Sequence, residues 1–225
     1  MPYTENEDLK QQETASAFSE IASQLSHAGR EFYSRGWVFG TSGNFSAVIR
    51  EDPLHLAITS SGVDKSALLP GNILQIDAEG KLLLEGGKSS AETLLHLIVV
   101  KARRAGAVLH THSIWSTVLS ELCAGDGGIS ITGFEMLKGL DGVQTHEHRE
   151  WVPIIENTQQ WDEARPYIED VLREHPGAHG FLIRGHGLYT WGRDVAEAKR
   201  HVEIFEFLFE VLGRKYSIAN REKFA

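Results

Sequence analysis

The chain has little cysteine and no excess of positive charge. Cys123 is the single cysteine among 225 residues, and 31 acidic residues stand against 22 basic ones. One cysteine excludes a disulfide within the chain, and together with the polar N-terminal stretch it predicts a reducing, cytoplasmic location. The formal net charge of -9 gives no general attraction for nucleic acid or for an anionic membrane. An anionic ligand would therefore need a local site.

Long apolar runs, internal repeats and long linkers are also absent from the sequence. No run approaches the roughly 18 apolar residues of a membrane span. The most apolar windows, such as EIFEFLFEVLG, carry charges at helical spacing. Because 41% of the residues are hydrophobic, the chain can bury a full core. We expect one domain over residues 1–225, with about the first ten residues as a flexible tail.

Helical and strand patterns alternate along the chain. Helical spacing covers 7–36, 91–105, 113–122, 161–175 and 194–215, with Ser113 and Asp194 as helix caps. Strand patterns cover 45–50, 55–62, 106–112, 151–157 and 178–187, and a hairpin is expected over 73–86. This alternation of hairpins and helices favours a mostly antiparallel sheet layered with helices.

Two histidines stand one residue apart in GAVLHTHS (106–113). Side chains in a strand repeat with period two, so His110 and His112 project from one face, with a rise of about 6.6 Å between them. His186 lies between two glycines in RGHGLYTWG (184–192), at the end of another predicted strand. Each element alone is common. Their presence together at two strand ends favours a site for zinc or a similar divalent metal.

Three short segments are typical of anion sites: TSGN (41–44), TSSG (59–62) and KSSAE (88–92). They are rich in hydroxyl groups and glycine, and the last one opens a helix whose N-terminal amides attract phosphate. Any one of them alone is better explained as an ordinary turn or helix cap. Three of them in an acidic protein favour a phosphorylated ligand.

Two glutamates are candidates for proton transfer. Glu92 lies in the first turn of a predicted helix, where the helix dipole also favours a carboxylate. Glu135 lies in the apolar segment ITGFEMLKGL, where burial would raise its pKa toward a value useful for acid and base chemistry. The spacing equally allows an exposed helical glutamate at position 135, so both interpretations stay open.

In their order and rough spacing, these motifs resemble those of the class II aldolase/adducin family, over residues 15–215. The resemblance implies an α/β/α sandwich around a central, mostly antiparallel sheet. It also implies one divalent metal per subunit, most often Zn2+, and a homotetramer whose sites lie near subunit interfaces. The substrate would be a small phosphorylated ketose.

Residue by residue, the resemblance implies three metal ligands: His110, His112 and His186. The phosphate-binding turns of the aldolases match Gly43, Asn44, Ser61, Gly62 and Ser90, with Ser89 and Lys65 close by. Glu92 matches the aldolase glutamate that serves as metal ligand and acid/base, and Glu135 matches the acid/base of the family's dehydrating members. Ala91 stands where the aldolases have a serine, which implies rearranged phosphate contacts.

The segments FEMLKGL (134–140) and VPIIENTQ (152–159) are similar to the methionine-salvage branch of the family. That branch implies dehydration of 5-methylthioribulose 1-phosphate to 2,3-diketo-5-methylthiopentyl 1-phosphate through a metal-stabilised enediolate. One alternative is a sugar-phosphate aldolase or epimerase of the fuculose or ribulose phosphate type. Another is an adducin-like interaction domain without catalysis, against which the retained histidines and Glu135 argue.

Overall fold

The computed structural model describes residues 4–221, with side chains from residue 12 to residue 219. Its centre is an eight-stranded sheet in the order β3-β2-β1-β4-β8-β7-β6-β5. The strands are β1 (Asn44–Arg50), β2 (His55–Thr59), β3 (Ile73–Ile76), β4 (Ala107–Thr111), β5 (Gly128–Ile131), β6 (Glu150–Ile155), β7 (Gly180–Ile183) and β8 (Gly187–Gly192). Only β6 and β7 pair in parallel among these strands. The predicted mostly antiparallel sheet is confirmed.

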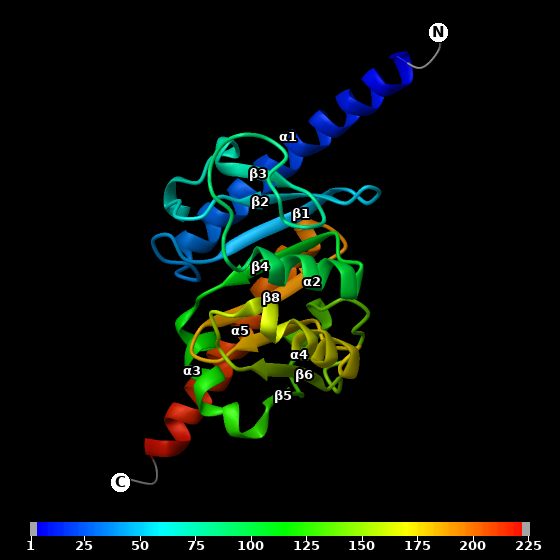
Figure 1. Cartoon of the computed structure of the whole chain (residues 1–225). Coiled ribbons are helices and arrows are strands. Elements are labelled where there is room, and N and C mark those ends of the chain that lie inside the picture. Colours follow the sequence, from blue (N-terminus) through cyan, green and yellow to red (C-terminus); the bar gives the residue numbers. More distant parts are fainter. Residues whose placement is uncertain (1–3, 222–225) are drawn as a thin grey trace.

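Helices cover both faces of the sheet (Figure 1). They are α1 (Thr4–Ser34), α2 (Thr93–Arg103), α3 (Ile114–Leu122), α4 (Trp161–Glu174) and α5 (Val195–Arg221). One core cluster joins the sheet to α2 and α4, a second joins it to α1 and α5, and a third lies between α3, α5 and the β5–β8 part of the sheet. The result is the predicted α/β/α sandwich.

Strand β4 lies at the centre of the sheet and is buried along its whole length. Successive side chains alternate between the two faces. Val108 packs in the cluster under α2 and α4, whereas Ala107 and Leu109 pack in the cluster under α1 and α5. His110 therefore projects on the α2 side of the sheet, and Thr111 on the α5 side.

The hairpin expected over residues 73–86 is wrong in its second half. The turn forms, because the Asp77 side chain accepts hydrogen bonds from the backbone of Glu79 and Lys81. Beyond an isolated bridge between Ile76 and Leu82, however, no strand follows. At this edge of the sheet Leu84 finds no layer to pack against and is 63% exposed.

Two further strands were not predicted. The short β5 was missed, and the segment expected as one strand over 178–187 is β7, a turn and the start of β8. At the N-terminus α1 is a single helix from Thr4, so residues 4–10 of the expected tail are helical, and residues 1–3 lie outside the described part. The flexibility of that tail stays a prediction. No helix within residues 4–221 has the length and apolarity needed to cross a membrane.

Candidate metal centre and substrate cavity

Three histidines come together where β4 ends and β8 begins. His110 is in β4, His112 follows that strand directly, and His186 lies in the turn between β7 and β8. Strands β4 and β8 are paired through Thr111 and Leu188, which brings the turn beside the end of β4. The approach is so close that a Cβ at Gly187 would lie 1.9 Å from the Thr111 carbonyl oxygen. The glycine after His186 is therefore required by packing.

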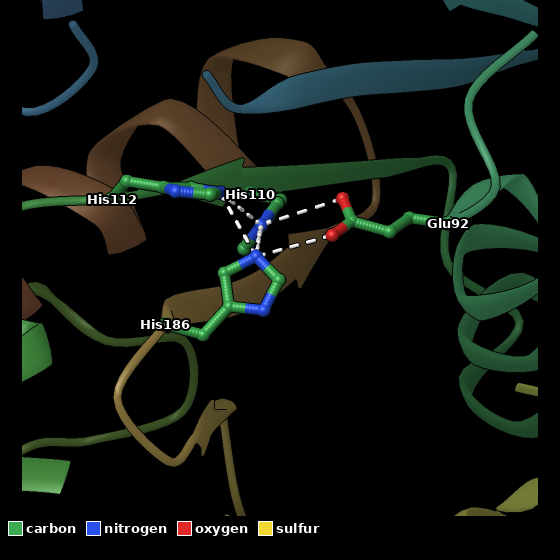
Figure 2. Close-up of side chains that lie close together, drawn as sticks. All are labelled: Glu92, His110, His112 and His186. Atoms are coloured by element: carbon green, nitrogen blue, oxygen red, sulfur yellow. Dashed lines mark hydrogen bonds and ion pairs between the residues drawn. The ribbon is translucent and has the colours of Figure 1, made fainter. Parts of the chain in front are cut away.

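The Nε2 atoms of the three imidazoles face one another (Figure 2). His110 Nε2 lies 2.7 Å from His112 Nε2 and 3.2 Å from His186 Nε2, and the latter two atoms are 3.1 Å apart. His110 Nδ1 donates to the Leu188 carbonyl at 2.9 Å, which leaves its Nε2 lone pair for the centre of the group. A ring nitrogen fixed by a backbone carbonyl is the usual arrangement of a ligating histidine.

Glu92 closes the fourth side of the group. It stands at the N-terminus of α2, with Oε1 3.1 Å from His186 Nε2 and Oε2 3.6 Å from His110 Nε2. The Asn44 amide and, at 3.3 Å, the Tyr189 hydroxyl donate to Oε2. Burial opposes ionisation of Glu92, but the hydrogen bond from His186 and the neighbouring histidines outweigh it and lower its pKa well below the ordinary value. The carboxylate is thus held as an anion.

The electrostatics of the histidines suit a cation. Burial, with the neighbouring His112, lowers the pKa of His110 well below its ordinary value. Burial and the neighbouring His186 lower the pKa of His112 to about 4. Both rings are therefore neutral near pH 7, the form that binds a metal.

The spacing of these donors also fits a divalent metal ion. Adjacent ligand atoms around a tetrahedral zinc with bonds of about 2.0 Å lie about 3.3 Å apart. Two of the Nε2 separations, 3.2 and 3.1 Å, are close to that value, and the third, 2.7 Å, is shorter. Three imidazoles and a carboxylate are donors that such ions prefer, so the group is consistent with a divalent metal site.

A cavity of about 580 Å³ opens beside this group. All seven residues predicted to bind substrate line it: Gly43, Asn44, Ser61, Gly62, Lys65, Ser89 and Ser90. The three predicted anion segments, separated in sequence, thus form one wall with Glu92 and His112. Contact of these residues with a ligand stays a prediction.

Lys65 provides a positive charge on this wall. Its side chain is buried, and its Nζ donates to the carbonyls of Thr41 and Val63, at 3.2 and 3.0 Å. Burial lowers the pKa of Lys65 to about 8. The ammonium group still carries most of its charge at pH 7 and is held in place by the turns that it joins.

The structure does not bring Glu135 into this group or its cavity. Glu135 begins the 3-10 helix η4 (Glu135–Gly139), where Leu137 is buried and the Glu135 side chain is 69% exposed. Its carboxylate pairs with Lys138 at 2.7 Å, and the hydrogen bond from Lys138 lowers its pKa. Of the two interpretations left open for Glu135, the exposed glutamate holds in the single chain, because its apolar neighbours Leu137 and Leu140 pack toward α5.

Some neighbours of the site were not predicted. Gln159, just before α4, and Trp161, its first residue, line the cavity, and neither was predicted to bind substrate. Tyr189 stacks on His110 with ring centroids 3.9 Å apart, and it follows two residues after Gly187, on the strand that pairs with β4. Its place opposite His110 depends on a strand pairing that the sequence did not predict.

A second histidine and carboxylate cluster among the described residues contains His148, Glu150 and His179. The buried Glu150 accepts from both histidines at 2.9 Å. The other ring nitrogen of His179 lies 2.8 Å from the Asp141 carbonyl. Burial alone would lower the pKa of His179, but hydrogen bonding to Glu150 outweighs it and raises the pKa. The cluster is thus an ion-paired link between β6 and the start of β7.

Comparison with known proteins agrees with this fold. The model of the class II aldolase and adducin N-terminal domain matches residues 23–212. The chain belongs to the class II aldolase and adducin family.

Within this family the chain is similar to proteins named methylthioribulose-1-phosphate dehydratase. The protein of Marinobacter nauticus is 45% identical over 194 residues, which cover 86% of this chain and 92% of that protein. The protein of Methylococcus capsulatus is 45% identical over 202 residues, which cover 89% and 97%. Among solved structures, Escherichia coli YgbL superposes with a TM-score of 0.70 at 26% identity, covering 86% of this chain and 88% of that one.

Proposed function

We propose that the protein is a cytoplasmic hydro-lyase of methionine salvage. It converts 5-methylthioribulose 1-phosphate to 2,3-diketo-5-methylthiopentyl 1-phosphate and depends on one divalent ion per subunit, Zn2+. The observation that carries this proposal is the group of three Nε2 atoms and one carboxylate beside a cavity lined with hydroxyl groups, amides and Lys65. The identity to two dehydratases over most of their length supports the particular reaction.

In this proposal the ion is held by His110, His112 and His186. The carboxylate of Glu92 lies next to the ion as a fourth group. A bound divalent ion supplies Lewis-acid polarisation of a carbonyl or hydroxyl oxygen. The chain's own residues bind and orient the substrate. Gly43, Asn44, Ser61, Gly62, Ser89 and Ser90 bind the phosphate with Lys65 as the nearby cation. Gln159 and Trp161 also line the cavity.

The reaction removes one proton from C3 and the hydroxyl group from C4, and the enol product becomes a diketone by tautomerisation. A single carboxylate near both positions can take the C3 proton and deliver it to the departing oxygen. We assign this role to Glu135, on the family resemblance of FEMLKGL.

Glu135 is exposed and lies outside the cavity of its own chain, so we propose that it completes the site of a neighbouring subunit in a homotetramer. Helix α3 supports an interface close to the metal group. It begins just after His112 and exposes Ile114, Val118 and Leu122 at intervals of four residues, two of them more than 60% exposed. An apolar row of this kind on one helix face is typical of a surface that a partner covers.

The proposal is tested by metal analysis and a direct assay. Purified protein should contain close to one divalent ion per chain and should form an ultraviolet-absorbing enol from methylthioribulose 1-phosphate. His110→Ala and His112→Ala should each lose most of the metal and most of the turnover, because each removes a ligand. A control variant, His27→Ala, changes a histidine exposed on α1 and should keep both. Full metal content in the two ligand variants would refute the assigned site.

The alternative reaction is aldol cleavage between C3 and C4, which the same metal group and phosphate site could support. Because proteins of one fold can catalyse different reactions, the fold does not distinguish the two, and the assay must do so. Release of dihydroxyacetone phosphate from a ketose 1-phosphate, without formation of the enol, would favour an aldolase over the dehydratase.

A further inference from the structure

A buried hydrogen-bonded chain leads from β1 to the carboxylate of Glu92. The Ser46 hydroxyl contacts His96 Nδ1 at 2.7 Å, His96 Nε2 contacts the Asn44 side-chain oxygen, and the Asn44 amide nitrogen contacts Glu92 Oε2. Ser46 and His96 are fully buried, and Asn44 is 6% exposed. His96 lies on α2, one helical turn after Glu92, so the chain alternates between β1 and this helix and links the two.

The chemistry of Glu92 sets the direction of every link. An ionised carboxylate only accepts, so the NH2 group of Asn44 must face Glu92. The amide oxygen of Asn44 then faces His96 and needs a donor, which places the proton of a neutral His96 on Nε2. Nδ1 is left as an acceptor for the Ser46 hydroxyl. Burial lowers the pKa of His96 to about 4, which agrees with a neutral ring.

Without the donor on His96, the Asn44 oxygen loses its partner, and only the bond from the amide nitrogen to Glu92 still holds this orientation. If it rotated by half a turn, its oxygen would face the carboxylate oxygen of Glu92, and the two would repel. The Tyr189 hydroxyl, at 3.3 Å, would be the remaining side-chain donor close to Glu92 Oε2. The bonds through Asn44 thus determine how Glu92 is aimed at the three histidines.

We propose that His96 is a positioning residue. With Nδ1 bonded to the Ser46 hydroxyl, its Nε2–H holds the Asn44 amide in one orientation, and the amide in turn holds Glu92 in the geometry that binds the metal. The inference rests on the proposed metal-dependent function. The competing explanation is that His96 only fills the core beside Tyr189, whose ring centroid lies 5.6 Å away.

The first test replaces His96 by phenylalanine, which keeps an aromatic ring beside Tyr189 and removes both nitrogens. The zinc affinity of the apoprotein, measured by competition with a chelator, should fall by about 10- to 100-fold, the usual effect of losing a residue that orients a ligand. Ser46→Ala should act in the same direction by a smaller factor. Ser217→Ala, a hydroxyl on α5 that bonds only its own helix, is the matched control.

A double-mutant cycle separates positioning from packing. In a Glu92→Gln background the carboxylate is already lost, so His96→Phe should weaken zinc binding by no more than about twofold further. An unchanged penalty in that background, or wild-type affinity in the folded single variant, would overturn the inference. Should His96→Phe fail to fold, the zinc affinity of Ser46→Ala and the histidine 15N resonances of the wild type test the inference instead. A proton on Nδ1 of His96 in the wild type would overturn the inference.

Failure of the proposed function gives a different result. A wild type that binds zinc, shows the nonadditive cycle and yet forms no enol from methylthioribulose 1-phosphate would refute the dehydratase and keep the role of His96. A wild type that forms the enol but gives an additive cycle would support the dehydratase and overturn the role of His96. A wild type that binds no divalent ion overturns both.

Discussion

At the scale of single residues, the group of three histidines depends on two glycines as well as on the histidines themselves. Gly43 has a φ of +75°, and a Cβ there would lie 2.8 Å from the His110 carbonyl oxygen. Gly187 allows β8 to begin against Thr111. Both positions bring backbone close to a histidine that the sequence singled out. The two glycines are therefore needed for the histidines to come together.

Gly187→Ala should therefore destabilise the protein by about 3 kcal/mol or more, because the added methyl group meets backbone that cannot move alone. Gly177→Ala is the control, since a Cβ there meets nothing within 4 Å, and its effect should stay within about 0.5 kcal/mol. Urea unfolding of both variants measures the difference. Equal stability of the two would show that β4 and β8 can separate at little cost.

The sequence predicted the histidines better than the carboxylates. The period of a strand is local information, so the pairing of His110 with His112 could be inferred from two adjacent positions. The surroundings of Glu135 depend on which way η4 turns, which its apolar neighbours decide by packing on α5. The bonds of His96 reach residues 50 and 52 positions away, and no spacing rule contains them.

At the scale of elements, α5 packs behind β4, the strand that carries His110. Glu206 on α5 is fully enclosed and accepts a hydrogen bond from Thr111, the residue between His110 and His112, at 2.9 Å. Burial raises the pKa of Glu206 to about 7, and the hydrogen bonds from Ser113 and Thr111 oppose the rise only in part. The carboxyl group is thus close to half protonated near neutral pH.

This raised pKa makes stability depend on pH. Between the ordinary value of 4.5 and about 7, the folded chain holds a proton on Glu206 that the unfolded chain has lost. Stability from this group is therefore present at low pH and falls as the pH rises through that window. Glu206→Gln should remove the effect, so that the loss of stability between about pH 5 and about pH 8 shrinks by roughly 2 kcal/mol.

Urea unfolding at the two pH values measures this change. Glu169→Gln, at an exposed position on α4, is the control and should keep the pH dependence of the wild type. The same slope in Glu206→Gln as in the wild type would contradict the assignment of a proton to the buried carboxyl group.

Most elements could be predicted where the pattern was long or capped. Ser113 accepts from the Ser116 backbone at 3.1 Å and Asp194 from the Glu197 backbone at 2.8 Å, so both predicted caps are confirmed. Short elements failed for a physical reason. Strand β5 has four residues and β8 has six. Both are strands because neighbouring strands pair with them, and the residues of so short a segment do not predict that pairing.

At the scale of the whole molecule, the position of Glu135 leads to a prediction about mixed oligomers. Glu135→Gln and His112→Ala should each be inactive alone. If Glu135 acts in the neighbouring site, random mixing of the two variants should restore about one quarter of wild-type activity, because each site needs the right variant on both sides. The measurement is enol formation after the variants are dissociated together and reassembled.

The mixing experiment has a control mixture and one outcome that would contradict the prediction. A mixture of His110→Ala with His112→Ala should stay inactive, because both defects lie in the same group of ligands. An inactive mixture of Glu135→Gln with His112→Ala, in tetramers shown to contain both chains, would place Glu135 in its own subunit or outside catalysis.

The turn that carries His186 has one further consequence. Of the three clustered histidines, two come from the end of β4, and the third stands 74 residues after His112, beyond α3, β5, β6, α4 and β7. Coordination at this point would cross-link the middle of the chain to its last third, closing a loop that contains two α-helices and three strands. Ion binding would then be coupled to the folding equilibrium itself, and zinc supply would influence how much folded protein a cell retains.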